Sequence, residues 1–350
     1  MHVSYLNCFR IDYVRVIMAY GKIAVIKSGA IGDVLMTTPF LACLRKAFPG
    51  AEICYITGKW SAGILEDNPD VDRIIAFDQD ALFHGSFFKK ISLFRKLRSR
   101  VMKEGFDLCF VMDKSWIAGF FARACGIPER VGFARDLEGV FLTKTVIYKR
   151  VKHEIQYYID LLAYFTKEKC STDMKIAISE EDRNLAGRVR RRAGTAKLLA
   201  FALGGGNPGQ DAAPRNWPFE NFSKLAEMAN ARGWKVVCLG KAGNAAGRNI
   251  QNLAGETTIK EAAAILSVCD ALVTGDSGLM HIASAVGIPI VSIFGPTDPR
   301  RKAPLNAKSA WLWRGSDCTK CELYGKYCAN HPLTSEITPE EVMNKIEAIL

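Results

Sequence analysis

Short apolar segments alternate with amphipathic segments along most of the chain. The apolar run at residues 22–28 ends in a small-residue turn, and residues 32–50 repeat apolar side chains at helical spacing up to Pro49 and Gly50, a typical helix terminator. Further patterns predict strands at residues 51–58, 71–78 and 106–113 and a helix at 115–126. Strands that alternate with helices imply a parallel sheet with helices on both faces.

The same alternation restarts in the second half. It predicts strands at residues 198–206, 235–240, 271–278 and 288–295, and helices at 219–233, 259–269, 279–287 and 337–350. In the last helix we expect Thr338 as the N-cap and Pro339 at the first position. The prediction is therefore an α/β protein with an N-terminal extension at residues 1–20, Rossmann-like domains at 21–170 and 171–335, and a C-terminal helix at 336–350.

Composition fits this two-domain organisation. A chain of 350 residues is too long for one ordinary core, and 49% apolar with 24% charged residues excludes a disordered protein. The formal net charge of +11 suits nucleic acid, anionic lipid or a phosphorylated substrate as partner, and net charge alone does not choose among them.

The start of the chain argues against secretion. No apolar run approaches the roughly 20 residues that cross a bilayer. Arg10, Asp12 and Arg15 interrupt the segment in which a signal peptide would need an apolar stretch. We therefore expect a cytosolic protein that can still touch a membrane from the inside, and we hypothesise that Met18 is the natural start.

The 11 cysteines fall into two groups. Eight are scattered, mostly within apolar segments, and are interpreted as small buried residues in a reducing compartment. The others give the spacing C-x2-C-x6-C-x2-H at Cys318, Cys321, Cys328 and His331. These four side chains could hold a structural zinc ion, or the cysteines could form a thiol cluster or a redox-sensitive pair.

Asp33 is the first residue with candidate chemistry. In facing doubly wound domains, substrates are expected at the carboxyl ends of the strands, and Asp33 follows the first strand in a turn with Gly29 and Gly32. It could be a first-turn carboxylate favoured by the helix dipole, or a general base that takes a proton from an attacking hydroxyl. Lys27 could hold a phosphate or tune that carboxylate.

Residues 204–218 form a glycine-rich loop before a helix. Small residues let backbone amides approach a ligand, and Arg215 could neutralise a phosphate by a bidentate contact. The loop matches neither the dinucleotide fingerprint nor the Walker pattern, which argues against NAD and against P-loop ATPase chemistry.

Residues 274–299 contain a third strand-to-helix turn. The amides of Asp276, Ser277 and Gly278 and the Ser277 hydroxyl could cradle a diphosphate. His281 follows one turn into the helix, and it could act there or be a core histidine bonded to backbone.

These three segments, in this order and spacing, resemble glycosyltransferase family 9, the ADP-heptose:lipopolysaccharide heptosyltransferases. The similarity runs from about Lys22 to the C-terminus, with its most specific parts in GDVLMTTP, PRNWP and DSGLMHIASAVGIPIVSIFGPTDP. The resemblance implies a GT-B fold that binds the sugar acceptor in the N-terminal half and the nucleotide-sugar in the C-terminal half. It also implies inverting chemistry that requires no metal or other cofactor.

The resemblance assigns roles residue by residue. Asp33 matches the proposed general base of the family, with Lys27 and Gly32 beside it near a phosphate or the acceptor. The family's donor-binding residues match Arg215, Asp276, Ser277, Gly278, Leu279 and His281, with Asn207 added from the preceding loop. The chain departs from some relatives at residues 241–244, where a glutamate would contact the nucleotide ribose.

A basic stretch is left at residues 82–103. Seven Lys/Arg residues and no acid lie between Lys89 and Lys103, while Phe87, Ile91, Phe94, Leu97 and Val101 recur at helical spacing. The stretch could be a surface helix that packs on the sheet, or an amphipathic element that faces an anionic membrane. The nearby Asp78-Gln79-Asp80 string is interpreted as a solvated turn, not as a metal-nucleotide site.

The combined prediction is transfer of heptose from ADP-heptose to the lipid A-core acceptor at the inner face of the inner membrane, by a cytoplasmic, peripheral enzyme. The alternatives are a related GT-B transferase that uses another nucleotide-sugar for a surface polysaccharide, and a non-catalytic nucleotide-binding protein. A nucleic-acid partner is not expected, because the helical spacing of the phenylalanines favours a core face over base-stacking platforms.

Overall fold

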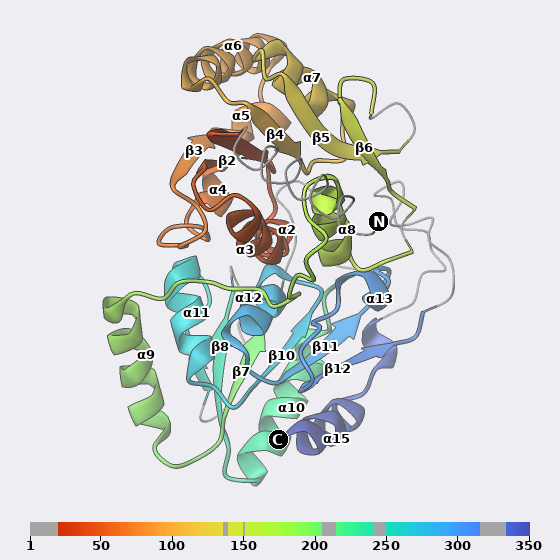
Figure 1. Ribbon diagram of the computed structural model, residues 1–350. Coiled ribbons are helices and arrows are strands. Elements are labelled where there is room, and N and C mark those ends of the chain that lie inside the picture. Colours follow the sequence, from red (N-terminus) through yellow and green to blue (C-terminus); the bar gives the residue numbers. More distant parts are fainter. Residues whose placement is uncertain (1–19, 136–138, 150, 205–214, 241–249, 316–333) are drawn as a thin grey trace, which may run out of the picture. The chain divides into compact units, whose positions relative to one another are not determined.

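A computed structural model describes residues 20–135, 139–149, 151–204, 215–240, 250–315 and 334–350. The chain divides into two compact units, Met1–Thr172 and Asp173–Leu350. Each unit contains its own six-stranded parallel sheet (Figure 1). The α/β class predicted from the alternation of strands and helices is therefore confirmed.

Unit 1 is built on a sheet with the order β3-β2-β1-β4-β5-β6. Its strands are β1 (Lys22–Ile26), β2 (Glu52–Gly58), β3 (Arg73–Phe77), β4 (Leu108–Val111), β5 (Glu129–Ala134) and β6 (Lys144–Ile147). Its helices are α2 (Ile31–Leu35), α3 (Thr38–Ala47), α4 (Lys59–Ala62), α5 (Gln79–Phe83), α6 (Phe87–Glu104), α7 (Trp116–Ala124), α8 (Glu154–Asp160) and the 3-10 turn η1 (Leu161–Tyr164).

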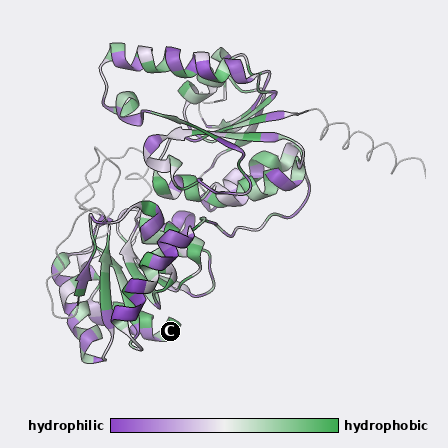
Figure 2. Cartoon of the chain, turned by 90° about the vertical axis from the view of Figure 1, so that its left-hand side faces the viewer, coloured by the Kyte–Doolittle hydropathy of each residue, from purple (hydrophilic) through white to green (hydrophobic). Residues whose placement is uncertain are grey.

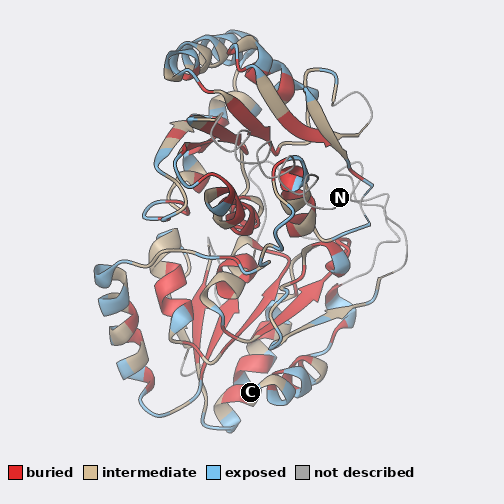
Figure 3. Cartoon of the chain, viewed as in Figure 1, coloured by how far each residue is buried: buried red, intermediate tan, exposed pale blue. Residues whose placement is uncertain are grey.

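Helices cover both faces of this sheet. Because side chains alternate along a strand, Cys109 and Val111 of β4 face one core together with residues of α6 and α7. Phe110, between them, points to the other face, where its ring meets Phe40 of α3 at 5.0 Å and Phe165 at 5.6 Å. The strand interiors of unit 1 are accordingly buried (Figure 3).

Unit 2 repeats the plan with the order β12-β11-β10-β7-β8-β9. Its strands are β7 (Leu198–Ala202), β8 (Lys235–Leu239), β9 (Ile250–Asn252), β10 (Ala271–Gly275), β11 (Ile290–Phe294) and β12 (Ser309–Trp313). Its helices are α9 (Glu180–Ala193), α10 (Phe219–Ala231), α11 (Ile259–Ser267), α12 (Gly278–Val286), α13 (Pro299–Lys302), the 3-10 turn η3 (Thr334–Glu336) and α15 (Pro339–Ile349).

The C-terminal helix completes the core of unit 2. Val342, Met343 and Ile346 of α15 are fully buried in one cluster with α10 and the sheet. The indole Nε1 of Trp217 donates to the carbonyl of Ile337 at 2.8 Å, which fixes the entry to the helix. As expected, Thr338 is the N-cap and Pro339 opens the helix, and a capping box forms with Glu341.

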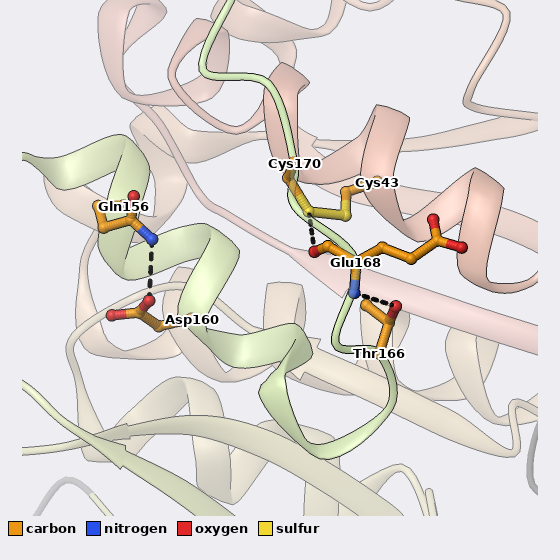
Figure 4. The surroundings of a disulfide bond; sticks show 6 residues. All are labelled: Cys43, Gln156, Asp160, Thr166, Glu168 and Cys170. Carbon is orange, nitrogen blue, oxygen red and sulfur yellow. Dashed lines mark hydrogen bonds between the residues drawn. A yellow bond between two sulfur atoms is a disulfide. The ribbon is translucent and has the colours of Figure 1, made fainter. Parts of the chain in front are cut away.

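Two expectations from the sequence are wrong in detail. Cys43 of α3 and Cys170 form a disulfide (Figure 4), so these two are not free buried thiols, whereas Cys54, Cys109, Cys238 and Cys269 are. Asp78 is the N-cap of α5, and Gln79 is 1% exposed instead of lying in a solvated turn. The disulfide joins positions 127 residues apart, and capping and burial place Asp78 and Gln79, so neither feature leaves a clear mark on the hydrophobic pattern.

Candidate functional site

The strand order marks one special point in each sheet. In unit 1 the chain moves from β1 toward β3 in one direction and from β4 toward β6 in the other, so the order reverses between β1 and β4. In unit 2 the same reversal occurs between β7 and β10. Ligands of doubly wound sheets bind beyond the carboxyl ends of the strands at such switch points. The predicted site residues of both units follow these strands.

In unit 1 the switch point holds a lysine between two carboxylates. Lys27, directly after β1, lies with its Nζ 2.9 Å from Asp113 Oδ1 and 3.4 Å from Asp33 Oδ2. Asp33 is in the first turn of α2, and Asp113 follows β4. The structure thus brings together Lys27, Gly32 and Asp33, as predicted, and adds Asp113.

Burial and charge set the state of Lys27. Its side chain is only 10% exposed, whereas that of Asp33 is 33% exposed. Burial lowers the pKa of Lys27, but Asp113 and Asp33 outweigh burial and raise this pKa well above its ordinary value. The lysine therefore keeps its charge between the two carboxylates. The Asp33 carboxylate is the more exposed partner of this pair of side chains, so a solvent or substrate hydroxyl can reach it.

Backbone contacts fix the turn that carries this triad. Asp113 Oδ2 accepts a hydrogen bond from the Ser28 amide at 2.8 Å, so one carboxylate orients both the lysine and the turn. Gly58 lies against the same turn, since its amide donates to the Ser28 carbonyl at 3.3 Å. A Cβ at Gly58 would lie 2.8 Å from the Ser28 carbonyl oxygen as well as 1.6 Å from Gln79 Oε1, so backbone would have to shift, which explains why this position holds glycine.

A second buried network adjoins the triad. Lys114 donates to Glu154, whose other oxygen accepts from the Tyr148 hydroxyl, and the ammonium lies 4.3 Å from the centre of the Tyr148 ring. Burial lowers the pKa of Lys114, and Glu154 opposes that effect. This network connects the end of β4 to α8, and so it holds the segment after Asp113 in place.

In unit 2, α12 begins directly after β10 at the switch point. Ser277 is its N-cap, and the Ser277 hydroxyl bonds the Met280 amide at 3.4 Å and the Thr274 hydroxyl at 2.8 Å. That hydroxyl therefore has a structural task that the sequence did not reveal. The first amides of a helix have no intrahelical acceptor, so those of Gly278 and Leu279 suit an anion.

Arg215 lies beside this helix start. Its Nη1 is 3.9 Å from Asp276 Oδ2, and both side chains are largely buried. Asp276 Oδ2 has no hydrogen-bond partner among the described residues. The backbone explains the proximity: a Cβ at Gly275 would meet the Arg215 carbonyl oxygen at 2.5 Å. Glycine at the end of β10 thus allows the arginine to approach the turn that opens α12.

The remaining predicted residues separate into two groups. His281 is 4% exposed in α12, and the Leu279 side chain lies near the end of β8, 3.8 Å from where a Cβ of Gly240 would be. Asn207 and the predicted zinc ligands Cys318, Cys321, Cys328 and His331 lie outside the described residues. Within the described part of the chain, no group of three or more His, Cys, Asp or Glu side chains could hold a metal ion.

Sequence reasoning missed Asp113. It stands directly after the strand of residues 106–113, at the same sheet edge as Asp33, and that position was the available signal. The missing step was the strand order, because only a sheet with β4 beside β1 brings Asp113 to Lys27.

Two doubly wound units, each with charged side chains at the switch point of its sheet, are the architecture of the GT-B fold. The model of glycosyltransferase family 9 (heptosyltransferase) matches residues 94–331, and the chain belongs to this family.

Curated relatives match over almost the whole chain. Lipopolysaccharide heptosyltransferase 2 of Escherichia coli (strain K12) is 25% identical over 352 residues, covering 94% of this chain and 98% of that protein. Lipooligosaccharide heptosyltransferase 2 of Haemophilus influenzae is 27% identical over 352 residues, covering 94% and 99%.

Solved structures agree with the fold. The glycosyl transferase family 9 structure from Veillonella parvula DSM 2008 superposes with a TM-score of 0.80 at 26% identity, covering 94% of this chain and 97% of that one. Escherichia coli heptosyltransferase WaaC with ADP-2-deoxy-2-fluoro heptose has the same fold, with a TM-score of 0.71 at 18% identity and coverage of 94% and 100%.

Proposed function

We propose that the protein transfers heptose from ADP-heptose to the inner core of lipopolysaccharide, in a single inverting displacement that needs no metal ion. Family membership and two relatives named as heptosyltransferases 2 support the sugar and the acceptor class. The ADP-sugar in one structure of the same fold supports the donor. We assign acceptor binding to unit 1 and donor binding to unit 2.

The observation that carries the proposal is the partly exposed carboxylate of Asp33 beside the buried, charged Lys27. In the proposed reaction Asp33 takes the proton of an acceptor hydroxyl. The hydroxyl oxygen then forms a bond to the anomeric carbon of the heptose, and the bond from that carbon to the donor phosphate breaks. General-base catalysis of this kind contributes a factor of about 10²–10⁴ to the rate.

The donor side stabilises the leaving group. ADP departs with the electron pair of the broken bond, so negative charge grows on its phosphate oxygens. In the proposal, Arg215 and the Gly278 and Leu279 amides neutralise that charge. Preorganised donors of this kind act without any metal ion, since they are aligned before the charge develops. Asp276 holds Arg215 in position from 3.9 Å away.

The proposed acceptor is carried on a lipid, and this places the enzyme at a membrane surface. We propose a peripheral position at the inner face of the inner membrane. Among the described residues, no helix is long and apolar enough to span a bilayer.

Product release from a panel of nucleotide-sugars, with a delipidated core oligosaccharide as acceptor, tests the proposal. We expect ADP release from ADP-heptose, little UDP release from UDP-sugars, and a kcat about 10²–10⁴ lower for Asp33→Asn. Glu181→Gln, which removes an exposed carboxylate of α9, is the matched control and should leave kcat unchanged. Full turnover by Asp33→Asn would show that another group is the base.

A further inference from the structure

Unit 1 carries an exposed apolar surface that the proposed reaction does not use. Phe87 and Phe88 at the start of α6 are 72% and 81% exposed, and Trp116 and Ile117 of α7 are 51% and 52% exposed. Soluble proteins rarely leave aromatic side chains gathered in this way without a partner. Hydrophilic (purple) and hydrophobic (green) residues alternate along α6, the uppermost helix in Figure 2, so apolar and charged positions are mixed along this helix.

The register of α6 separates a core face from an exposed face. Leu93, Phe94, Leu97 and Val101 pack into the core of unit 1. The exposed face consists of Phe87, Ile91, Arg95 and Met102, whereas Arg98 is only partly exposed. The helical spacing of Phe87 and Phe88 favoured a core face for these rings, and this is wrong, because both are exposed. Folding does not account for the apolar residues of the exposed face.

Packing contacts join α6 to α7 beside the exposed face. Phe94 stacks on Phe120 with the ring centres 5.9 Å apart, and Arg98 Nε donates to the Ala124 carbonyl at 2.7 Å. Phe120 and Trp116 then meet Phe141, at 5.3 and 6.3 Å between ring centres. Two helices and the segment before β6 therefore share one aromatic surface.

Charge selects the partner. The stretch from Lys89 to Lys103 has seven basic residues and no acid, and exposed Arg123 adds another cation from α7. Tryptophan and phenylalanine beside lysine and arginine suit the headgroup region of an anionic bilayer, where rings enter the interface and cations meet lipid phosphates. Single-stranded nucleic acid would use exposed rings as stacking platforms and has no use for aliphatic side chains. The exposed aliphatic side chains of Ile91, Met102 and Ile117 suit a bilayer interface instead.

We propose that the α6–α7 surface, defined as Phe87, Phe88, Ile91, Trp116, Ile117 and Phe120 with the basic residues of α6, docks on an anionic lipid bilayer. The exposed rings enter the headgroup region and the cations lie over anionic lipids. The proposal rests on the proposed function only in so far as a lipid-carried acceptor requires a membrane surface.

Vesicle co-sedimentation with the full-length protein tests the docking. The probes are vesicles of phosphatidylcholine with about 30% phosphatidylglycerol, and phosphatidylcholine alone as reference. Each cation near an anionic surface contributes about a fivefold factor in binding, so Arg95→Gln/Lys96→Gln should weaken binding about 25-fold. Phe87→Ser/Phe88→Ser should weaken it at least tenfold, because the rings lose their place in the interface.

Matched variants in unit 2 control for charge and hydrophobicity. Arg191→Gln/Arg192→Gln makes the same charge change at exposed positions of α9, and Leu305→Ser removes another exposed apolar side chain. Both should bind vesicles like the unchanged protein. The proposal is overturned if the protein does not bind anionic vesicles, or if the α6 variants bind them as well as the controls. It is also overturned if an oligonucleotide displaces the protein from the vesicles and the α6 variants no longer bind that oligonucleotide.

A second readout separates this proposal from the proposed function. Vesicle binding needs no donor or acceptor, so it is measured whether or not heptose is transferred. Conversely, the α6 variants should retain turnover on the delipidated acceptor and lose it on an acceptor embedded in anionic vesicles. Trp116 fluorescence, isolated by comparison with Trp116→Phe, should shift to shorter wavelength when vesicles are added.

Discussion

Lys27 is a buried cation of unit 1 that pairs with two carboxylates. A lysine that is 8% exposed would normally be costly, and Asp113 and Asp33 offset that cost. Tyr158 lies nearby, and burial raises its pKa well above the ordinary value, so its phenol stays neutral. The lysine is therefore the fixed positive charge that orients Asp33.

Lys27→Met should lower both activity and stability. Loss of the cation leaves Asp113 largely buried without its partner, which costs about 3–5 kcal/mol of the free energy of unfolding. Asp33 loses its orienting charge, so we expect kcat to fall about 100-fold while the KM for the donor changes little. Steady-state kinetics and denaturant unfolding measure the two effects.

The double variant Lys27→Met/Asp113→Asn distinguishes the two effects. It removes both buried charges, so most of the lost stability should return, while kcat stays low. Recovery of kcat together with stability would mean that Lys27 acts on folding alone.

At the level of single residues, the sequence was informative wherever a residue follows a predicted strand. Lys27, Asp33 and Asp276 belong to that class. It failed where the role depends on a distant partner: the pairing of Asp113 with Lys27 spans 86 positions, and so does not show in a local pattern. The cap formed by Ser277 also uses a hydroxyl that the sequence assigned to the ligand.

Helices and strands position the site residues through close backbone packing, as the contact between the end of β10 and Arg215 shows. Gly275 ends the strand against the carbonyl of Arg215. Gly275→Ala places a methyl group 2.5 Å from that oxygen, so the Arg215 backbone must move. We expect about a tenfold increase in the KM for the donor, together with a loss of about 1–3 kcal/mol in stability from overpacking.

Gly233→Ala is the matched control for that variant. Gly233 has a φ of 76° after α10 and has open space around its Cβ position. An alanine there costs about 1–2 kcal/mol through backbone strain alone. Isothermal titration with ADP should therefore separate the two: an unchanged affinity in both variants would remove Gly275 from donor binding.

Elements with strong periodicity were predictable, and of the edge strands only β3 was predicted, at residues 71–78. The central strands of each sheet are continuous apolar runs because both faces are buried. The edge strands β6 and β9 are short and only partly buried, so they carry no such run and were absent from the prediction. The sequence pattern merged α2 and α3 into one helix. The two residues between them, Met36 and Thr37, are buried as well, so the hydrophobic pattern shows no break there.

On the scale of the whole molecule, the chain folds as two units with separate cores. Unit 2 depends on its last helix: Val342, Met343 and Ile346 each contribute about 1.5–3 kcal/mol by burial, or about 5–9 kcal/mol together. That is comparable with the whole stability of a typical domain, about 5–15 kcal/mol.

Truncation after Ile337 should therefore unfold unit 2 and spare unit 1. Limited proteolysis should then leave a fragment of about residues 20–172 and degrade the remainder. Thr338→Ala is the control, since it removes only the cap of α15 and costs about 1 kcal/mol. Survival of both halves, or loss of both, would contradict this view of two separately stabilised units.

The completeness of each sheet has a consequence for how such enzymes change. All strands of β1–β6 lie before Thr172 and all of β7–β12 after it, so no hydrogen-bonded ladder among the described strands crosses that boundary. One half can therefore be inherited or exchanged as a module. A recombined gene that joins residues 1–172 to the second half of a relative keeps each described strand pairing within one half. With the acceptor on unit 1 and the donor on unit 2, as proposed, the two preferences could then evolve independently.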